Sequence, residues 1–252
     1  MNTINKVGMR DLGGHQASVE TYIQTHNDQG AVQLPVNEIF HTMQGEATHT
    51  GTPATFLRFQ GCAVSCPWCD TAKTWNVNPA HEVSVTEMLA KVDDSSAYAS
   101  LTTPEIIDIL EAGAPRAVVI TGGEPCNYDL RALTTGLLRV KTLVQIETSG
   151  TQPIQADPNV WVTVSPKVGM PGGFVVRHDA VEMADEIKWP VGSPRDVANL
   201  IAFLETYKVR PTVPVWLQPL SRSKKATDLC IEQATLNGWR VSIQVHALLG
   251  VR

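Results

Sequence analysis

The sequence predicts an α/β fold built on a mostly parallel sheet that is either open or curled toward a barrel. Two observations support this prediction: short apolar, β-rich runs recur along the chain, and segments with helix start and stop signals lie between them. Such runs are typical of strands that helices cover on both faces. No internal repeat, low-complexity segment or linker interrupts the alternation, so we expect residues 35–252 to form one domain.

Seven segments are predicted to be strands. In chain order they are 54–59 (ATFLRF), 117–120 (AVVI), 143–146 (LVQI), 160–164 (VWVTV), 186–189 (EIKW), 213–217 (VPVWL) and 240–245 (RVSIQV). Four of them run into polar, glycine-rich or cysteine-rich loops, at 61–75, 121–125, 147–151 and 165–167. Because ligands bind at the carboxyl ends of parallel strands, these loops predict a functional site on one rim of the sheet.

Helix signals fall between the strands. Ser84 and Glu87 form a capping-box pattern. Thr103 followed by Pro104 predicts the start of a helix that Gly113 ends. Two later helices are expected, one beginning at the Ser-Pro pair 193–194 and one running from about 224 to the Asn-Gly pair 237–238. In the first of these, the spacing i, i+3, i+4, i+7 predicts one buried face, made of Val197, Leu200, Ile201 and Leu204.

Composition excludes several classes of protein. The 252 residues are 43% hydrophobic and 18% charged, as in ordinary globular proteins, and the net charge of −5 provides no basic field for nucleic acid or an anionic membrane. No apolar run approaches the ~20 residues of a membrane span, and the N-terminus lacks the apolar stretch of a secretory signal. We expect a cytoplasmic protein with no nucleic-acid or membrane partner. The polar residues 1–34 are expected to form a loosely held extension, in which one or two helical turns are possible around 17–26.

Three of the five cysteines, Cys62, Cys66 and Cys69, have the spacing C-x3-C-x2-C. In a reducing compartment such a group more often binds metal than forms disulfides, and thiolates favour zinc, copper(I) or iron–sulfur clusters. A structural zinc ion needs a fourth Cys or His, which Cys126 could supply from the same predicted rim. A [4Fe–4S] cluster with three cysteines leaves one iron open, which explains a triad if that iron is the reaction site. Two alternatives stay open: a zinc site, and three buried or unrelated thiols that bind no metal.

The triad resembles the signature of radical S-adenosylmethionine (SAM) enzymes, and TGGEP at 121–125 resembles their GGE motif. The ordered motifs VNEIFHTMQGEATHTG, FLRFQGCAVSCPWCDT, TGGEP, ETSGT, SPK and SIQVHALLGVR narrow the resemblance to the 7-carboxy-7-deazaguanine synthase family, from about residue 36 to the C-terminus. This resemblance implies a trimmed partial (β/α) barrel with a mostly parallel sheet. It also implies conversion of 6-carboxy-5,6,7,8-tetrahydropterin to 7-carboxy-7-deazaguanine with loss of ammonia, in 7-deazapurine (queuosine) biosynthesis.

The resemblance further implies cofactors and binding residues. Cys62, Cys66 and Cys69 would hold a [4Fe–4S] cluster, and the hydroxyl of Thr71 would bind Mg²⁺. SAM would bind to residues of the four loops, namely Trp68, Cys69, Asp70, Gly122, Gly123, Glu124, Ser165, Pro166 and Lys167. The pterin substrate would bind to Met43, Gln44, Gly45, Glu46, Arg58, Thr121, Gln244 and His246. No catalytic residue is implied beyond the cofactor ligands, and an electron donor such as flavodoxin and a homodimeric state are implied as partners.

Several of these residues have a second interpretation. Arg58 could be a surface residue at a strand end, and His246 an ordinary hydrogen-bonded side chain. Thr71 and Glu124 could each cap the segment that follows them. Lys188, in EIKW, is left unassigned because the pattern does not decide whether it points into a barrel or into solvent.

The chain also departs from the family pattern. The family's QGEG is QGEA here, and Ala47 restricts φ relative to glycine. The 34-residue extension is not part of the common pattern either. The alternatives for the whole protein are another small radical SAM enzyme, such as a glycyl-radical activase, and a non-catalytic zinc-binding module.

Overall fold

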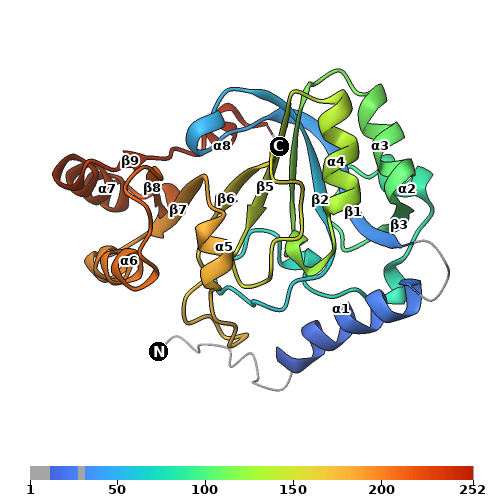
Figure 1. Ribbon diagram of the computed structural model, residues 1–252, viewed down its shortest axis with the longest axis horizontal. Coiled ribbons are helices and arrows are strands. Elements are labelled where there is room, and N and C mark those ends of the chain that lie inside the picture. Colours follow the sequence, from blue (N-terminus) through green and yellow to red (C-terminus); the bar gives the residue numbers. More distant parts are fainter. Residues whose placement is uncertain (1–11, 28–31, 252) are drawn as a thin grey trace.

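The computed structural model describes residues 12–27 and 32–251. Within these residues a nine-stranded sheet forms the centre, in the order β3-β1-β2-β4-β5-β6-β7-β8-β9 (Figure 1). Strand β1 pairs antiparallel with β2 and β3, whereas the pairs from β2 to β9 are parallel. The predicted α/β class with a mostly parallel sheet is therefore confirmed. The strands are β1 (Gln33–Met43), β2 (Pro53–Phe59), β3 (Ala99–Thr102), β4 (Ala117–Gly122), β5 (Leu143–Thr148), β6 (Trp161–Val164), β7 (Glu186–Val191), β8 (Val215–Pro219) and β9 (Arg240–Val241).

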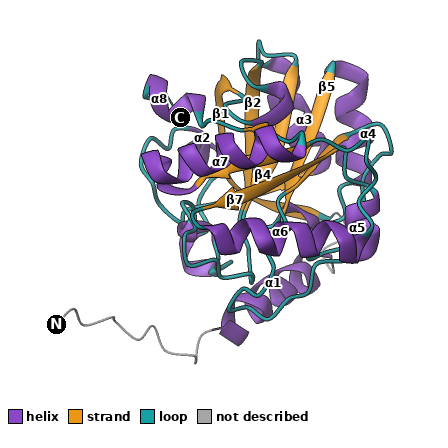
Figure 2. Cartoon of the chain, turned by 90° about the vertical axis from the view of Figure 1, so that its left-hand side faces the viewer, coloured by secondary structure: helices purple, strands orange, loops and turns teal. Residues whose placement is uncertain are grey.

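Helices lie against the outside of this curved sheet (Figure 2). They are α1 (Leu12–Asn27), α2 (Val85–Leu89), α3 (Thr103–Ala112), α4 (Arg131–Val140), α5 (His178–Glu182), α6 (Pro194–Tyr207), α7 (Lys224–Asn237) and α8 (Val245–Leu249). Leu57, Ile120 and Ile146 on neighbouring strands are fully buried in one cluster with Leu133 and Leu137 of α4. Because full burial of such a side chain stabilises the fold by about 1.5–3 kcal/mol, this cluster fixes the strands whose carboxyl ends carry the predicted loops.

The local helix signals are largely confirmed. Ser84 and Glu87 form the predicted capping box at α2, and Gly113 follows the last residue of α3. In α6, however, Ile201 is 41% exposed and Phe203 is buried instead, so the predicted face is wrong at that position. The buried stripe follows 197, 200 and 203, because α6 packs along the i, i+3 row.

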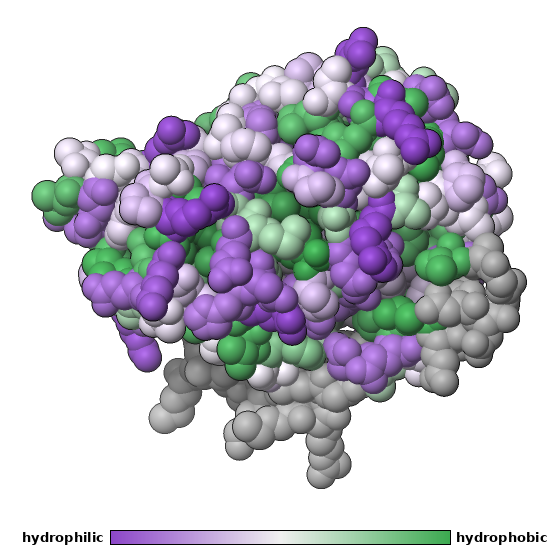
Figure 3. Space-filling view, viewed as in Figure 1, coloured by the Kyte–Doolittle hydropathy of each residue, from purple (hydrophilic) through white to green (hydrophobic). Residues whose placement is uncertain are grey.

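Figure 3 shows one face of the molecule, on which hydrophobic and hydrophilic residues are interspersed.

The last predicted strand, 240–245, is mostly wrong. Only Arg240 and Val241 pair with β8, and the chain then leaves the sheet. The backbone N–H of Val245 donates to the carbonyl of Gly45 at 3.0 Å, where α8 begins. The strand ends at Val241 because the chain turns there to contact the loop between β1 and β2.

The two ends of the sheet, β3 and β9, do not pair with each other within the described residues, so the barrel is partial. The loop 44–52 between β1 and β2 crosses the gap. The N–H of Ala47 donates to Ser242 Oγ at 3.0 Å, and that of Thr48 to Glu186 Oε2 at 3.1 Å. We call this contact between loop 44–52 and strands β7 to β9 the seam. It is closed by individual hydrogen bonds, most of them to side chains, and not by strand pairing.

The N-terminal extension differs in part from expectation. Residues 1–11 and 28–31 lie outside the described residues, but 12–27 form the single helix α1, along the lower edge of Figure 1. Val19 and Tyr22 are 1% and 4% exposed and belong to the main core cluster. Over these residues the extension is packed on the domain and not loosely held. No helix among the described residues combines the length and hydropathy needed for a bilayer crossing.

Candidate active site

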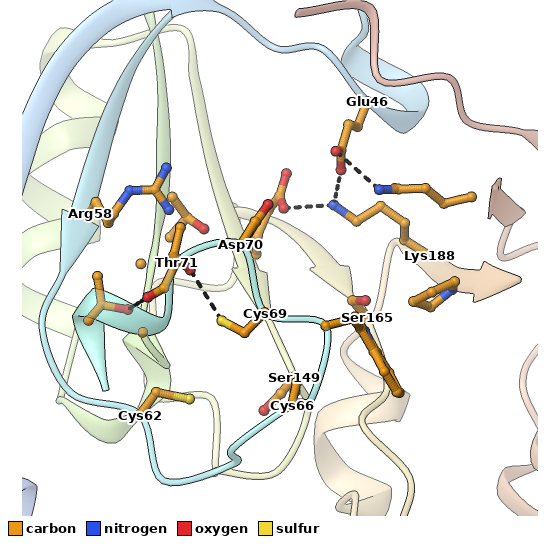
Figure 4. Close-up of a pocket in the computed structure, with 18 of the residues that line it drawn as sticks. Glu46, Arg58, Cys62, Cys66, Cys69, Asp70, Thr71, Ser149, Ser165 and Lys188 are labelled. Carbon is orange, nitrogen blue, oxygen red and sulfur yellow. Dashed lines mark hydrogen bonds and ion pairs between the residues drawn. The ribbon is translucent and has the colours of Figure 1, made fainter. Parts of the chain in front are cut away.

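A cavity of about 460 Å³ opens at the predicted rim, and 18 of the 20 sequence-predicted site residues line it. Figure 4 shows the three cysteines on one side of this space and Glu46 with Lys188 on the other. The exceptions are Gly45 and Pro166. The predicted residues that line the cavity are Met43, Gln44, Glu46, Arg58, Cys62, Cys66, Trp68, Cys69, Asp70, Thr71, Thr121, Gly122, Gly123, Glu124, Ser165, Lys167, Gln244 and His246.

The cysteine loop brings its three thiols to the cavity wall. Cys62 and Cys66 are buried and Cys69 is half-buried. Burial, reinforced by the Glu124 carboxylate, raises the pKa of Cys62 to about 12, and burial raises that of Cys66 to about 11. Iron–sulfur binding requires thiolates, so the metal must displace these protons on binding. Cys126 does not line the cavity but packs in the main core, so it does not supply a fourth ligand.

The donor set fits an iron–sulfur cluster better than a single ion. Within residues 12–27 and 32–251, no three His, Cys, Asp or Glu side chains are grouped closely enough to hold one metal ion. The three thiols instead line one side of a cavity of about 460 Å³, and soft thiolates suit an iron–sulfur cluster. Thr71 lies at the edge of this triad, with its hydroxyl 3.6 Å from Cys69 Sγ. Thr71 takes an N-cap position, but its side chain caps no N–H, and the residue lines the cavity.

Two glycines of the TGGEP loop are required by packing. Gly122 has φ +128°, and a Cβ there would lie 2.2 Å from the backbone nitrogen of Phe59. A Cβ on Gly123 would lie 2.3 Å from the carbonyl oxygen of Gly61. Strand β4 therefore approaches the start of the cysteine loop more closely than any side chain permits.

Glu124 connects two of the rim loops. It caps the turn after it by accepting from the N–H of Cys126, which confirms its second interpretation. It also accepts from the Thr148 hydroxyl at 2.6 Å and from the N–H and hydroxyl of Ser149. With four donors on one buried carboxylate, Glu124 fixes the TGGEP loop against the ETSGT loop.

The SPK turn places an ammonium group beside the cysteines. Lys167 Nζ donates to the carbonyl and hydroxyl oxygens of Ser165, at 2.9 and 2.5 Å. Burial lowers the pKa of Lys167, and the neighbouring Cys66 opposes this shift. Pro166 is buried behind the turn, so it shapes the turn without reaching the cavity.

The opposite wall of the cavity holds a charge cluster that sequence reasoning only partly found. Lys188 Nζ donates to Glu46 Oε2 at 2.5 Å and to Glu147 Oε2 at 2.8 Å. Gln44 donates to Glu147 at 2.9 Å, and Gln244 donates to Glu46 at 2.9 Å. Burial alone would raise the pKa of Glu46, but Lys188 and Gln244 outweigh it and lower that pKa to about 2.

Lys188 and Glu147 are the main residues that the sequence analysis missed. Glu147 belongs to a motif, ETSGT, that was recognised without a role for its carboxylate. Lys188 stands in a strand whose neighbours are buried on both faces, and a lysine in such a strand signals a buried ionic partner. The attraction of two carboxylates raises the pKa of Lys188 despite its burial.

Arg58 is a cavity residue and not a surface residue, since its side chain is only 16% exposed. Its Nε donates to Glu38 Oε1 at 2.6 Å, and its guanidinium carbon lies 5.8 Å from the centre of the Phe40 ring. Glu38 is buried, so this contact fixes the plane of the guanidinium. The charge of Arg58 is thereby held on the side of the cavity formed by β2 and β4, where Arg58 pairs with Thr121.

Gly45 and His246 act together. A Cβ on Gly45 would lie 2.1 Å from His246 Nδ1, so the glycine makes room for the imidazole ring. His246 lines the cavity, whereas Gly45 supports it from behind. The predicted contribution of the C-terminal segment to the pocket thus depends on Gly45, whose lack of a side chain leaves room for His246.

Comparison with known proteins identifies the chain's relatives. A 4Fe-4S single cluster domain matches residues 44–152. The chain is 44% identical to the 7-carboxy-7-deazaguanine synthase of Escherichia coli K12 over 222 residues, which is 87% of this chain and 100% of that protein. It is 37% identical to the enzyme of the same name from Buchnera aphidicola, over 86% of this chain and 99% of that protein. The crystal structure of QueE from Escherichia coli superposes with a TM-score of 0.82 at 44% identity, covering 90% and 98% of the two chains.

The fold and the site define a radical SAM enzyme, with a partial barrel, a cysteine triad at its rim and a polar cavity beside it. Its cofactors are a [4Fe–4S] cluster and SAM. The chain belongs to the 7-carboxy-7-deazaguanine synthase family. The comparisons give no support to a glycyl-radical activase or a zinc-binding module.

Proposed function

We propose that this chain converts 6-carboxy-5,6,7,8-tetrahydropterin to 7-carboxy-7-deazaguanine with release of ammonia. The observation that carries the proposal is the cavity, which has a volume of about 460 Å³. In it the cysteine loop faces a wall of amide, carboxylate and ammonium groups. A small bicyclic molecule with polar edges and one carboxylate suits such a space. Membership of the family supports the choice of reaction.

Cys62, Cys66 and Cys69 hold the cluster in this proposal, and SAM lies between Trp68, Asp70 and the TGGEP and SPK loops. When bound, the reduced cluster and SAM supply the radical chemistry that begins the reaction. The chain itself binds and orients the cofactors and the substrate, and it excludes water. Lys167 offers a positive charge to the carboxylate of SAM, while Glu124 keeps two rim loops at a fixed separation.

The substrate carboxylate binds to Arg58, whose planar fork matches it and whose orientation Glu38 fixes. We place Mg²⁺ at the hydroxyl of Thr71, because a hard cation prefers oxygen donors and also takes ligands from substrate and water. The amide-like edge of the pterin faces Gln44 and Glu46. Lys188 keeps Glu46 ionised, so this carboxylate accepts hydrogen bonds from N–H groups of the substrate.

The remaining expectations extend the proposal beyond the single chain. An electron donor such as flavodoxin reduces the cluster, two copies of the chain form a homodimer, and the reaction takes place in the cytoplasm. Size-exclusion chromatography with light scattering measures the oligomeric state.

The proposal is tested by anaerobic reconstitution of the cluster, followed by incubation with the tetrahydropterin, SAM, Mg²⁺ and a chemical reductant. Mass spectrometry should detect 7-carboxy-7-deazaguanine. The variant Cys66→Ala should lose both the visible iron–sulfur absorption and turnover, because it removes a ligand. The variant Arg58→Ala should keep the cluster and raise KM at least tenfold, since a charged hydrogen bond to a carboxylate is worth about 1.5–3 kcal/mol. A fully loaded enzyme that forms no deazapurine would refute the substrate assignment and leave the cofactor assignment intact.

A further inference from the structure

Helix α1 precedes the part of the chain that carries the family motifs. The Escherichia coli relative aligns over its whole length with 87% of this chain, and the family motifs begin at Val36, after α1 (Leu12–Asn27). The helix nevertheless contacts the cysteine loop. The function of this contact therefore has to be sought in α1 itself, because the helix lies outside the segment that carries the family motifs.

The backbone where the cysteine loop leaves and re-enters the domain forms a neck, which we define as residues 60–62 and 74–77. Two backbone hydrogen bonds close it. The N–H of Gly61 donates to the carbonyl of Thr74 at 2.6 Å, and the N–H of Cys62 donates to that of Trp75 at 2.9 Å. Since Cys62 belongs to the neck itself, the position of the first thiol follows the position of this backbone.

The inner side of the neck is fixed by the TGGEP loop. The carbonyl of Gly61 accepts from the N–H of Glu124 at 2.8 Å and from Asn127 Nδ2 at 3.1 Å. Gly123 packs directly against the same carbonyl. These contacts come from the common part of the fold, and they hold one side of the neck.

The outer side of the neck is covered by α1. Ser18 Oγ accepts from the backbone N–H of Val77 at 3.2 Å. A Cβ on Gly61 would lie 2.8 Å from a methyl carbon of Val19, which shows how closely the helix approaches that peptide. Tyr22 lies edge-on to Tyr128 at 6.4 Å, and the Tyr128 hydroxyl donates to the carbonyl of Gln60 at 2.7 Å.

We propose that α1 is a brace that holds the neck of the cysteine loop and thereby slows the loss of iron from the cluster. Without the helix, Gly61 and Val77 would lose these outer contacts, and the Cys62 thiolate would leave its iron more often. Val19 and Tyr22 are positioning residues in this proposal, since they act on Cys62 through the backbone. The inference rests on the cluster and not on the substrate, so a failed deazapurine assay would not bear on it.

The test measures the rate of iron release from the full-length, reconstituted protein after an excess of iron chelator is added anaerobically. Val19→Ala and Tyr22→Ala should lose their visible absorption about threefold to tenfold faster than the wild type, because each removes buried packing against the neck. Tyr22→Phe keeps the ring and should release iron at nearly the wild-type rate. Thr21→Ala, on the exposed face of the same helix, is the matched control and should leave the rate unchanged.

Thermal unfolding of the cluster-free proteins separates bracing from general stabilisation. If α1 acts as a brace, Val19→Ala should release iron faster than the wild type even though its cluster-free Tm stays within a few degrees of the wild-type value. If Val19→Ala releases iron at the wild-type rate, or if release follows Tm alone across the variants, the proposal is overturned. Should Tyr22→Ala fail to fold, Val19→Ala decides the outcome by itself.

Discussion

At the scale of single residues, Ala47 illustrates strain at a family-specific position. Its φ of +55° is a left-handed conformation, and its N–H bonds to Ser242 across the seam. A side chain in this region costs roughly 1–2 kcal/mol, which glycine avoids at the expense of greater freedom in the unfolded chain. Ala47→Gly should therefore raise the free energy of unfolding by about 0.5–1 kcal/mol, measured by urea denaturation.

Two control substitutions to glycine test this expectation, one at a left-handed position and one inside a strand. Lys208, at φ +49° after α6, should also gain stability when replaced by glycine. Ala117 lies buried inside β4, where Ala117→Gly should reduce stability. A loss of stability in Ala47→Gly would show that burial of its methyl group outweighs the strain.

The residue scale also shows where the sequence was sufficient. The spacing of Cys62, Cys66 and Cys69 on one loop located the metal-binding wall, because close positions in sequence must be close in space. Lys188 could not be assigned in the same way. It meets Glu46, 142 residues earlier, and this contact depends on how loop 44–52 folds back into the barrel.

At the scale of elements, the contact between the ends of β2 and β4 predicts a sharp effect of one methyl group. Gly123→Ala would place a carbon against the carbonyl of Gly61 and push the neck outward. We expect the variant to take up less than half of the wild-type iron on reconstitution, measured by iron and sulfide analysis. The matched control is Gly192→Ala, whose nearest neighbour is the flexible side chain of Leu220 at 3.1 Å. Equal iron content in the two variants would contradict the expectation.

Elements with local signals were predicted well, and those without them were not. Helices α2, α3, α6 and α7 each have a capping residue or a terminal glycine in the sequence. Helix α4 was missed because Leu130 stands at its N-cap and no side chain caps it. Strands β1 and β3 were missed because their pairing with each other and with β2 gives them a mixed polar and apolar pattern. The short β9 ends early because of a distant contact that no local pattern records.

At the scale of the whole molecule, the buried pair of Lys188 and Glu46 links global stability to pH. The pKa of Glu46 is about 2 in the folded protein against a usual 4.5, so ionised Glu46 stabilises the fold above pH 4.5, on the order of 3 kcal/mol. That stabilisation is lost as the pH falls from 4.5 toward 2. Lys188→Met should abolish it, because the methionine leaves the largely buried carboxylates of Glu46 and Glu147 without a counter-ion.

Urea denaturation at pH 7, 5 and 3 measures this effect. The wild type should lose stability between pH 5 and 3, whereas Lys188→Met should be several kcal/mol less stable at pH 7 and should gain stability relative to the wild type on acidification. Lys224→Met, which breaks the exposed pair with Asp228, should change stability by less than about 1 kcal/mol at any of these values. Parallel pH curves for wild type and Lys188→Met would argue against the assignment.

The seam between the two ends of the sheet has a consequence for how the interior is reached. A cylinder closed by a continuous ladder can be opened only by unzipping a strand, which costs many cooperative bonds. Here the join is made by individual contacts of loop 44–52, namely those of Ala47 and Thr48, the Gly45–Val245 backbone bond and the ion pair of Glu46 with Lys188. Separation of the wall there would break these contacts, including the ion pair of Glu46 with Lys188, but it would leave every strand paired to its neighbours.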